Sequence, residues 1–280
     1  MSQRIEARER LLGEITGNKM VRLTMSDRRQ ALNRLLRARS NYEDARREVI
    51  LYEQALFFRV VVFGSARLPK GSEEYQNVSA LARILVQTRP FDTVSGGGPG
   101  IMEAVHQGAN IAVLEAKDVG KKVKIRTHGV TIDLPKRENP NAHNHFITKH
   151  QEFTTRLQEF LDLTQAAYVG PGGFGTALEL LFLIQNKQVN HLEPEYPIIA
   201  DPIWEPVIRK MNEKLYHQRV ATDKIPFINE EDLKLVTFTN NMETVAGIFV
   251  QTYDKWRTNI RDHVTTKPAH KISLLNSSFR

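Results

Sequence analysis

A glycine-rich stretch from Gly170 to Glu179, which reads G-P-G-G-F-G-T-A-L-E, carries the residue types best suited to holding a phosphate. Glycines let the backbone turn tightly and approach a ligand without obstruction by a Cβ atom. A helix-forming run follows, so free N–H donors and the helix dipole are expected to favour an anion there. These donors belong to Gly172, Gly173, Gly175 and Thr176. Glu179 lies about one turn further on and is expected to face the tethered ligand.

Two further turns of small residues have the same character. Gly64 to Arg67 (G-S-A-R) follows a continuous apolar run, and Ser95 to Gly100 (S-G-G-G-P-G) follows a shorter one. Loops at the carboxyl ends of parallel strands converge on one crevice, so we expect the three turns to share a ligand. Each turn alone could serve packing only, but two glycine clusters that each open a helix favour a nucleotide or sugar-phosphate site. The further candidate binding residues are Ser65, Gly97, Gly98, Met102 and Glu103.

A dinucleotide is the weaker hypothesis for the ligand. Gly170, Gly172 and Gly175 match G-x-G-x-x-G. The acidic residue of the next strand would be Asp201, which comes late for a ribose-binding carboxylate, and the turn does not lie in the first βα unit. We therefore expect no nicotinamide cofactor.

Metal and thiol chemistry find little support in the sequence. Cysteine is absent, which excludes disulfides, thiolate catalysis and cysteine zinc sites. The histidines lack the spacing of a metal site, so we expect no metal and place them in loops or on the surface. No lysine stands in a context typical of a Schiff-base former, which argues against pyridoxal phosphate chemistry. The histidines considered are His143, His145, His150 and His191.

Strands and helices alternate in the part of the chain that contains the three turns. Such alternation indicates an α/β protein, a Rossmann-like doubly wound parallel sheet with helices on both faces. The predicted strands are 59–63, 92–95, one within 123–132, 166–169, 196–200 and 233–239. The predicted helices are 72–88, 101–117, 150–164, 176–189, 203–216 and 242–260, and residues 134–144 are expected to form a loop.

The N-terminal part is expected to be a helical extension of this domain. A short amphipathic helix over 2–15 precedes a longer one from Ser26 or Asp27 to Leu56. Apolar residues in the longer helix form a two-line heptad seam, which requires the first helix, the main domain or a second subunit as its partner. The seam consists of Leu35, Tyr42, Val49 and Leu56 with Ala38, Ala45 and Tyr52. We divide the chain into an N-terminal helical extension 1–58, a Rossmann-like nucleotide-binding domain 59–262 and a flexible tail 263–280.

The distribution of charge and hydropathy along the chain indicates which classes of partner the protein can bind. The 280 residues carry a formal net charge of +7, to which residues 1–59 contribute +5, residues 254–280 contribute +4 and the middle −2. The positive excess therefore belongs to the two ends, and we do not expect a nucleic acid at the glycine turns. No apolar run approaches the length of a membrane span, and the first residues lack a signal peptide pattern. These features predict a soluble, cytoplasmic protein without a membrane partner.

The paired glycine motifs resemble the signatures of the LOG (Lonely Guy) family of phosphoribohydrolases, once labelled lysine decarboxylases. Pro171 to Glu179 matches the family pattern P-G-G-x-G-T-x-x-E in full. Ser95 to Ala104 (S-G-G-G-P-G-I-M-E-A) resembles the second family motif. The family has an arginine fifteen residues before the proline, which corresponds to Arg156. The resemblance covers about residues 59–250.

The resemblance implies hydrolysis of the N-glycosidic bond of a nucleoside 5′-monophosphate to free base and ribose 5-phosphate. Glu179 would stabilise the oxocarbenium-like state or activate water. Arg156 would orient the substrate with its fixed fork of donors. The resemblance also implies a homodimer or a higher homo-oligomer, in which Arg156 could act across the subunit interface.

Three positions depart from the plant-type members of the family. Thr154 and Leu157 stand where those members have a histidine and a lysine, and Leu178 stands where they have a glutamate. The loss of these polar groups favours a general bacterial nucleotide nucleosidase over a cytokinin-specific enzyme. The alternative is a non-catalytic nucleotide-binding or regulatory protein that retains the phosphate cradle. In that case Glu179 is only a carboxylate favoured by the helix dipole, and Arg156 only a surface charge.

Overall fold

The computed structural model describes residues 25–133 and 139–266 of the chain. It divides the chain into two units between Leu51 and Tyr52, within the first described helix and ahead of the boundary expected at residue 58. The short helix predicted over 2–15 lies outside the described residues.

The described part of the first unit belongs to α2 (Met25–Leu56), the long helix that the heptad pattern predicts. The large apolar residues of the seam are exposed along this helix. Its last turn belongs to the second unit, where the Gln54 carbonyl accepts a hydrogen bond from Trp256 Nε1 (3.0 Å) and Glu53 pairs with Arg59. Residues 52–58 are therefore part of the folded α/β unit.

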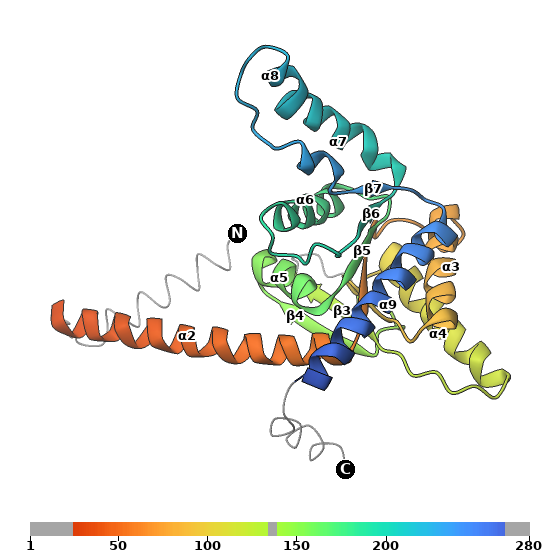
Figure 1. The fold of residues 1–280 in the computed structure, drawn as a ribbon. Helices are drawn as coiled ribbons and strands as arrows, with labels where there is room; N and C mark the ends of the chain where they lie inside the picture. Colours follow the sequence, from red (N-terminus) through yellow and green to blue (C-terminus); the bar gives the residue numbers. More distant parts are fainter. Residues whose placement is uncertain (1–24, 134–138, 267–280) are drawn as a thin grey trace. The chain divides into compact units, whose positions relative to one another are not determined.

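A seven-stranded sheet in the order β4-β3-β2-β1-β5-β6-β7 forms the second unit (Figure 1). All neighbouring strands are parallel. The strands are β1 (Arg59–Phe63), β2 (Asp92–Ser95), β3 (Thr127–Ile132), β4 (Phe146–His150), β5 (Ala166–Val169), β6 (Ile198–Ala200) and β7 (Thr237–Phe238). This topology confirms the Rossmann-like, doubly wound fold predicted from the sequence.

Helices cover both faces of the sheet. The longer ones are α3 (Glu73–Thr88), α4 (Ile101–Asp118), α5 (Phe153–Leu163), α6 (Phe174–Gln188), α7 (Glu205–Asn212) and α9 (Met242–Thr266), with a short α8 (Gln218–Val220). Successive side chains of β1 point to opposite faces. Val60 and Val62 pack with α3, α4 and α9, whereas Val61 and Phe63 pack with α5 and α6. Because β1 is buried on both faces, its sequence is continuously apolar, as in a central parallel strand.

The sequence-based prediction of helix 150–164 was wrong at its start. Residues 146–150 form β4, which pairs with β3 at the edge of the described sheet, and α5 begins at Phe153. Its half-exposed sequence F-I-T-K-H has no buried apolar run, so the pairing with β3 and not the local pattern makes it a strand.

The C-terminal elements also differ in detail from the prediction. The helix predicted over 203–216 is divided into a 3-10 turn at 202–204, α7 and a π turn at 213–217. The strand predicted over 233–239 shortens to β7, which follows a 3-10 turn. Helix α9 continues to Thr266, past the expected start of the tail. None of the described helices combines the length and the apolar character needed to cross a membrane.

Candidate active site

Loops from three strands meet at the point where the strand order reverses. β1 lies between β2 and β5, so its C-terminal turn is adjacent to the turns of both neighbours. The backbone joins the three loops, since Ser65 N donates to Pro171 O (2.8 Å) and Ile101 N donates to Ser65 O (3.0 Å). Ligands of open α/β sheets bind in such a crevice.

A cavity of about 810 Å³ lies at this crevice. Ten of the eleven residues selected from the sequence line it: Arg156, Glu179, Ser65, Gly97, Gly98, Met102, Gly172, Gly173, Gly175 and Thr176. Only Glu103 does not. The structure thus brings both glycine motifs, the arginine and the glutamate to one cavity within a single chain.

Arg156 and Glu179 face each other across the floor of this cavity. Their Nη1 and Oε1 atoms are 3.5 Å apart, and both side chains are nearly buried. Arg156 Nε donates to the Val130 carbonyl (2.9 Å), and its guanidinium carbon lies 5.2 Å from the centre of the Phe160 ring. These contacts hold the guanidinium in place before any ligand binds.

The Glu179 carboxyl group has an unusual environment for an acid. Burial raises its pKa to about 7, and the positive charge of Arg156 opposes this increase. A carboxyl group with a pKa near neutrality can exchange protons at physiological pH, which is the property required of a general base. Perturbed acids in a cleft are typical of catalytic sites.

The turn after β5 leads directly into α6, as the sequence predicts, although the helix begins at Phe174 and not at Thr176. Its first α-helical hydrogen bond is donated by Ala177 N to Gly173 O (2.9 Å), so the preceding amides have no partner within the helix. Gly173 supplies no side-chain cap. A Cβ atom on Gly172 would collide with the buried Thr176 side chain, which explains the glycine at that position. The arrangement leaves backbone donors open to an anion.

The turn after β2 also lines the cavity, through Gly96, Gly97 and Gly98. Gly97 adopts a φ of 76°, a left-handed conformation that favours glycine, and packs against Gly129 and Thr131 of β3. Its N–H donates to Ser95 Oγ (3.1 Å). Gly96 is in contact distance of the Arg156 and Met102 side chains, because a Cβ atom there would overlap both.

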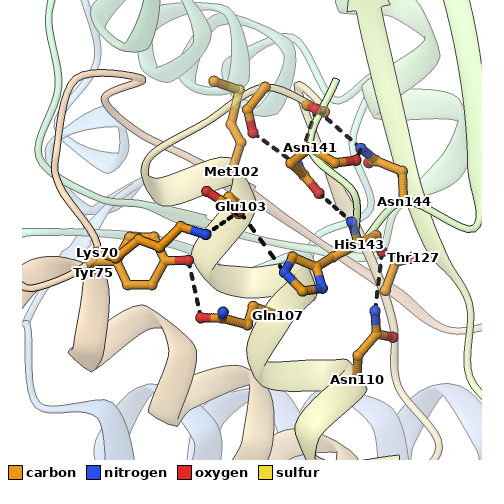
Figure 2. A network of polar contacts seen from close by, with 12 residues as sticks. Lys70, Tyr75, Met102, Glu103, Gln107, Asn110, Thr127, Asn141, His143 and Asn144 are labelled. Carbon is orange, nitrogen blue, oxygen red and sulfur yellow. Dashed lines mark hydrogen bonds and ion pairs between the residues drawn. The ribbon is translucent and has the colours of Figure 1, made fainter. Parts of the chain in front are cut away.

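Glu103 points away from the cavity. Its Oε1 atom lies 2.9 Å from Lys70 Nζ and 3.9 Å from His143 Nε2 (Figure 2). The carboxylate therefore joins α4 to the loops that carry Lys70 and His143. We correct its expected role from cavity lining to a link between these loops.

Several cavity residues were not selected from the sequence. Arg67 follows β1, Phe153 begins α5, and Phe174 begins α6 with 98% of its surface exposed. Thr131 and Ile132 come from the end of β3. The position of Arg67 just after a predicted strand could have identified it as a cavity residue. The two phenylalanines have no such signal in the sequence, because each follows a turn whose path is known only from the fold.

Asp201, the acidic residue weighed for a dinucleotide, has a structural role. Its Oδ1 atom accepts a hydrogen bond from Ile203 N (2.9 Å) and caps the 3-10 turn after β6. Across the described residues, no group of three or more His, Asp or Glu side chains is arranged to hold a metal ion.

A family model described as "Possible lysine decarboxylase" matches residues 102–248, slightly more than half of the chain. The chain belongs to the LOG family. The match includes Arg156, Glu179 and the whole glycine turn after β5, whereas the turns after β1 and β2 that also line the cavity precede the matched residues. No curated protein matches the chain.

Solved structures similar to this LOG-family chain include two molybdenum cofactor proteins. The molybdenum cofactor binding protein from Rippkaea orientalis is 15% identical, with 69% of this chain and 97% of that chain covered and a TM-score of 0.46. The molybdenum cofactor carrier protein from Chlamydomonas reinhardtii is 13% identical, with 71% and 99% covered and a TM-score of 0.45.

Proposed function

We propose that this chain hydrolyses the N-glycosidic bond of a nucleoside 5′-monophosphate. The observation that carries the proposal is the Arg156–Glu179 pair, 3.5 Å apart beside two glycine turns in one cavity. The open amides at the start of α6 suit the phosphate. The carboxyl group is then one helical turn away from the anion, near the sugar.

The proposed reaction adds water across the bond between the anomeric carbon and the base. As the base leaves, the sugar becomes oxocarbenium-like and positively charged. The Glu179 carboxylate either stabilises this charge or takes the proton of the attacking water. Arg156, which stays cationic at all relevant pH, orients the substrate. The products are the free base and ribose 5-phosphate.

A panel of purine and pyrimidine monophosphates tests the proposal directly. We expect the purified protein to release free base from at least one of them, and Glu179→Ala to lose that activity. Turnover of none, or full activity in Glu179→Ala, contradicts the proposal. Calorimetric binding of a monophosphate without base release instead supports a non-catalytic nucleotide-binding protein.

We further propose that the chain forms a homodimer through the exposed face of α6. Phe174, Leu178 and Leu181 form one apolar stripe on this helix, with 98%, 45% and 40% of their surfaces exposed. Phe153 of α5 is also exposed and lines the same cavity. A second copy would bury these side chains beside the cavity mouth.

Light scattering tests the dimer without altering the cavity lining. Leu178→Glu together with Leu181→Glu is expected to lower the molar mass of the assembly, because buried charges oppose association. Exposed Val119→Glu on the other face of the sheet serves as the control. An unchanged mass in the double variant contradicts this interface.

A further inference from the structure

The glycine turn after β2 is fixed by its carbonyl oxygens. Gly97 O accepts three hydrogen bonds, from Asn141 N (2.8 Å), Asn141 Nδ2 (3.0 Å) and Asn144 Nδ2 (3.1 Å). Gly98 O accepts a further bond from Asn141 Nδ2 (2.8 Å). Two asparagines of one loop therefore hold two consecutive carbonyl groups of the turn.

The loop that carries the asparagines is itself held in place (Figure 2). Asn141 Oδ1 accepts from His143 N (3.0 Å), which fixes which end of the amide faces the glycine turn. The His143 carbonyl accepts from Asn110 Nδ2 (3.2 Å) on α4 and from Thr127 Oγ1 (2.6 Å) on β3. The donors to Gly97 and Gly98 thus have a rigid base.

The geometry of the peptide bond between Gly97 and Gly98 determines which way the Gly98 N–H points. In a trans peptide, the carbonyl of one residue and the N–H of the next point in opposite directions, and the described chain contains no cis peptide. Gly97 O points toward Asn141 and Asn144, neither of which lines the cavity. The N–H of Gly98 therefore points away from these two asparagines, and Gly98 itself lines the cavity.

We propose that Asn141 and Asn144 are positioning residues that aim the Gly98 N–H at an anionic oxygen of the phosphate group. The inference rests on the proposed function, because it assumes a phosphorylated sugar in this cavity. A backbone donor that is oriented before binding contributes to affinity without a cost of reorganisation. Neither asparagine touches the ligand; both act through the turn.

Calorimetric titration with ribose 5-phosphate tests the proposal. Asn141→Ala and Asn144→Ala are each expected to weaken binding on the order of tenfold, the effect of losing one well-placed hydrogen bond. Asn139→Ala, an exposed residue of the same loop, is the matched control and should bind like the wild type. Wild-type affinity in both Asn141→Ala and Asn144→Ala overturns the proposal, as does failure of the unaltered protein to bind ribose 5-phosphate.

Kinetics separate positioning from a general loss of structure. A contact to the phosphate is made in the ground state and in the transition state alike, so KM should rise while kcat changes little. A fall in kcat with an unchanged KM overturns the proposal. Thermal unfolding of each variant identifies a global defect. Asn144→Ala leaves the three bonds from Asn141 to the glycine turn in place, so it provides the test if Asn141→Ala does not fold.

The two proposals can fail separately. If asparagine-dependent binding of ribose 5-phosphate occurs without base release from any monophosphate, the positioning role stands and the hydrolase function fails. If base release occurs with unchanged KM in both asparagine variants, the hydrolase function stands and the positioning role fails.

Discussion

Glu179 is subject to two opposing effects, since burial raises its pKa to about 7 while the charge of Arg156 acts to lower it. The proposed reaction needs the carboxylate form. We therefore predict that kcat/KM increases with pH up to about 7 and is constant above it, which initial rates across that range will measure. Glu179→Gln should lower kcat about 10²- to 10⁴-fold and abolish this pH dependence.

A wild-type kcat/KM that does not fall as the pH decreases below about 7 would contradict this prediction. If kcat/KM of Glu179→Gln falls at low pH in the same way as that of the wild type, a group other than Glu179 causes the pH dependence. Because Glu179→Gln preserves the size of the side chain, thermal unfolding of the variant should show that the fold is retained.

Gly96 controls the position of Arg156. A methyl group at residue 96 would overlap the Arg156 guanidinium and lie 2.5 Å from Met102 Sδ, and both are flexible ends of side chains. We predict that Gly96→Ala displaces Arg156 and lowers kcat/KM at least tenfold, since catalysis is sensitive to displacements of about 1 Å. The thermal midpoint should fall little.

Gly71→Ala is the matched control, because the added methyl group at this exposed residue has open space. It should leave both the rate and the thermal midpoint unchanged. If Gly96→Ala and Gly71→Ala have the same kcat/KM, the reaction does not depend on the exact position of the Arg156 guanidinium.

At the scale of elements, α4 contains a histidine that makes the unit sensitive to acid. His106 is wholly buried, and burial lowers its pKa to about 3. Below the unfolded pKa of about 6.5, the unfolded chain binds a proton that the folded chain takes up only near pH 3. Stability is therefore complete above about pH 6.5 and falls as the pH decreases.

We predict that this linkage destabilises the wild type by about 2 kcal/mol between pH 7 and about pH 5. His106→Leu should lack this part of the pH dependence, which urea unfolding at the two pH values will measure. His191→Leu, at an exposed position, is the control. An identical loss of stability in His106→Leu and the wild type would contradict the prediction.

The elements that the sequence predicts well are those with their own buried pattern. β1, with its continuous apolar run, and α3, with the Ser72 cap that accepts from Tyr75 N (3.2 Å), follow from local chemistry. β4 does not, because its pairing with β3 fixes its conformation. The division of the helix predicted over 203–216 likewise depends on contacts that periodicity does not record.

The residues of the candidate site were likewise predictable only where local sequence determines their position. The motif residues meet at one cavity because strand ends converge, a rule that applies before any coordinates are known. Glu103 was misplaced because neighbouring positions of α4 point in different directions, so that Met102 lines the cavity and Glu103 does not. Asn141 and Asn144 were not identified, since their role depends on a loop that closes over the glycine turn from a distant part of the chain.

At the scale of the whole molecule, the boundary at Tyr52 defines where the chain can be shortened. Removal of residues 1–51 keeps Glu53 and Gln54, which pair with Arg59 and Trp256. We predict that the full chain associates further through the exposed heptad seam of α2, so that residues 52–280 retain the thermal midpoint of the α/β unit and the dimer through α6 but form a smaller assembly. Light scattering and thermal unfolding measure the two effects.

A second truncation that removes residues 1–58 is to be compared with the chain of residues 52–280. It deletes the buried Phe58 and the contacts of residues 53 and 54, so the thermal midpoint should fall. An unchanged assembly mass in the chain of residues 52–280 would show that the seam has no role in association.

The place of β5 beside β1 has a consequence for how the protein is made. Val60 pairs with Ala166, roughly 100 residues later in the chain, and the bond from Ser65 N to Pro171 O closes the same long loop. Contacts of such long range form slowly, since the entropy of loop closure is lost before they are made. During synthesis, the turn after β1 therefore cannot complete these contacts until Pro171 has left the ribosome, and the cavity forms only after the central strands β1 and β5 have both been made.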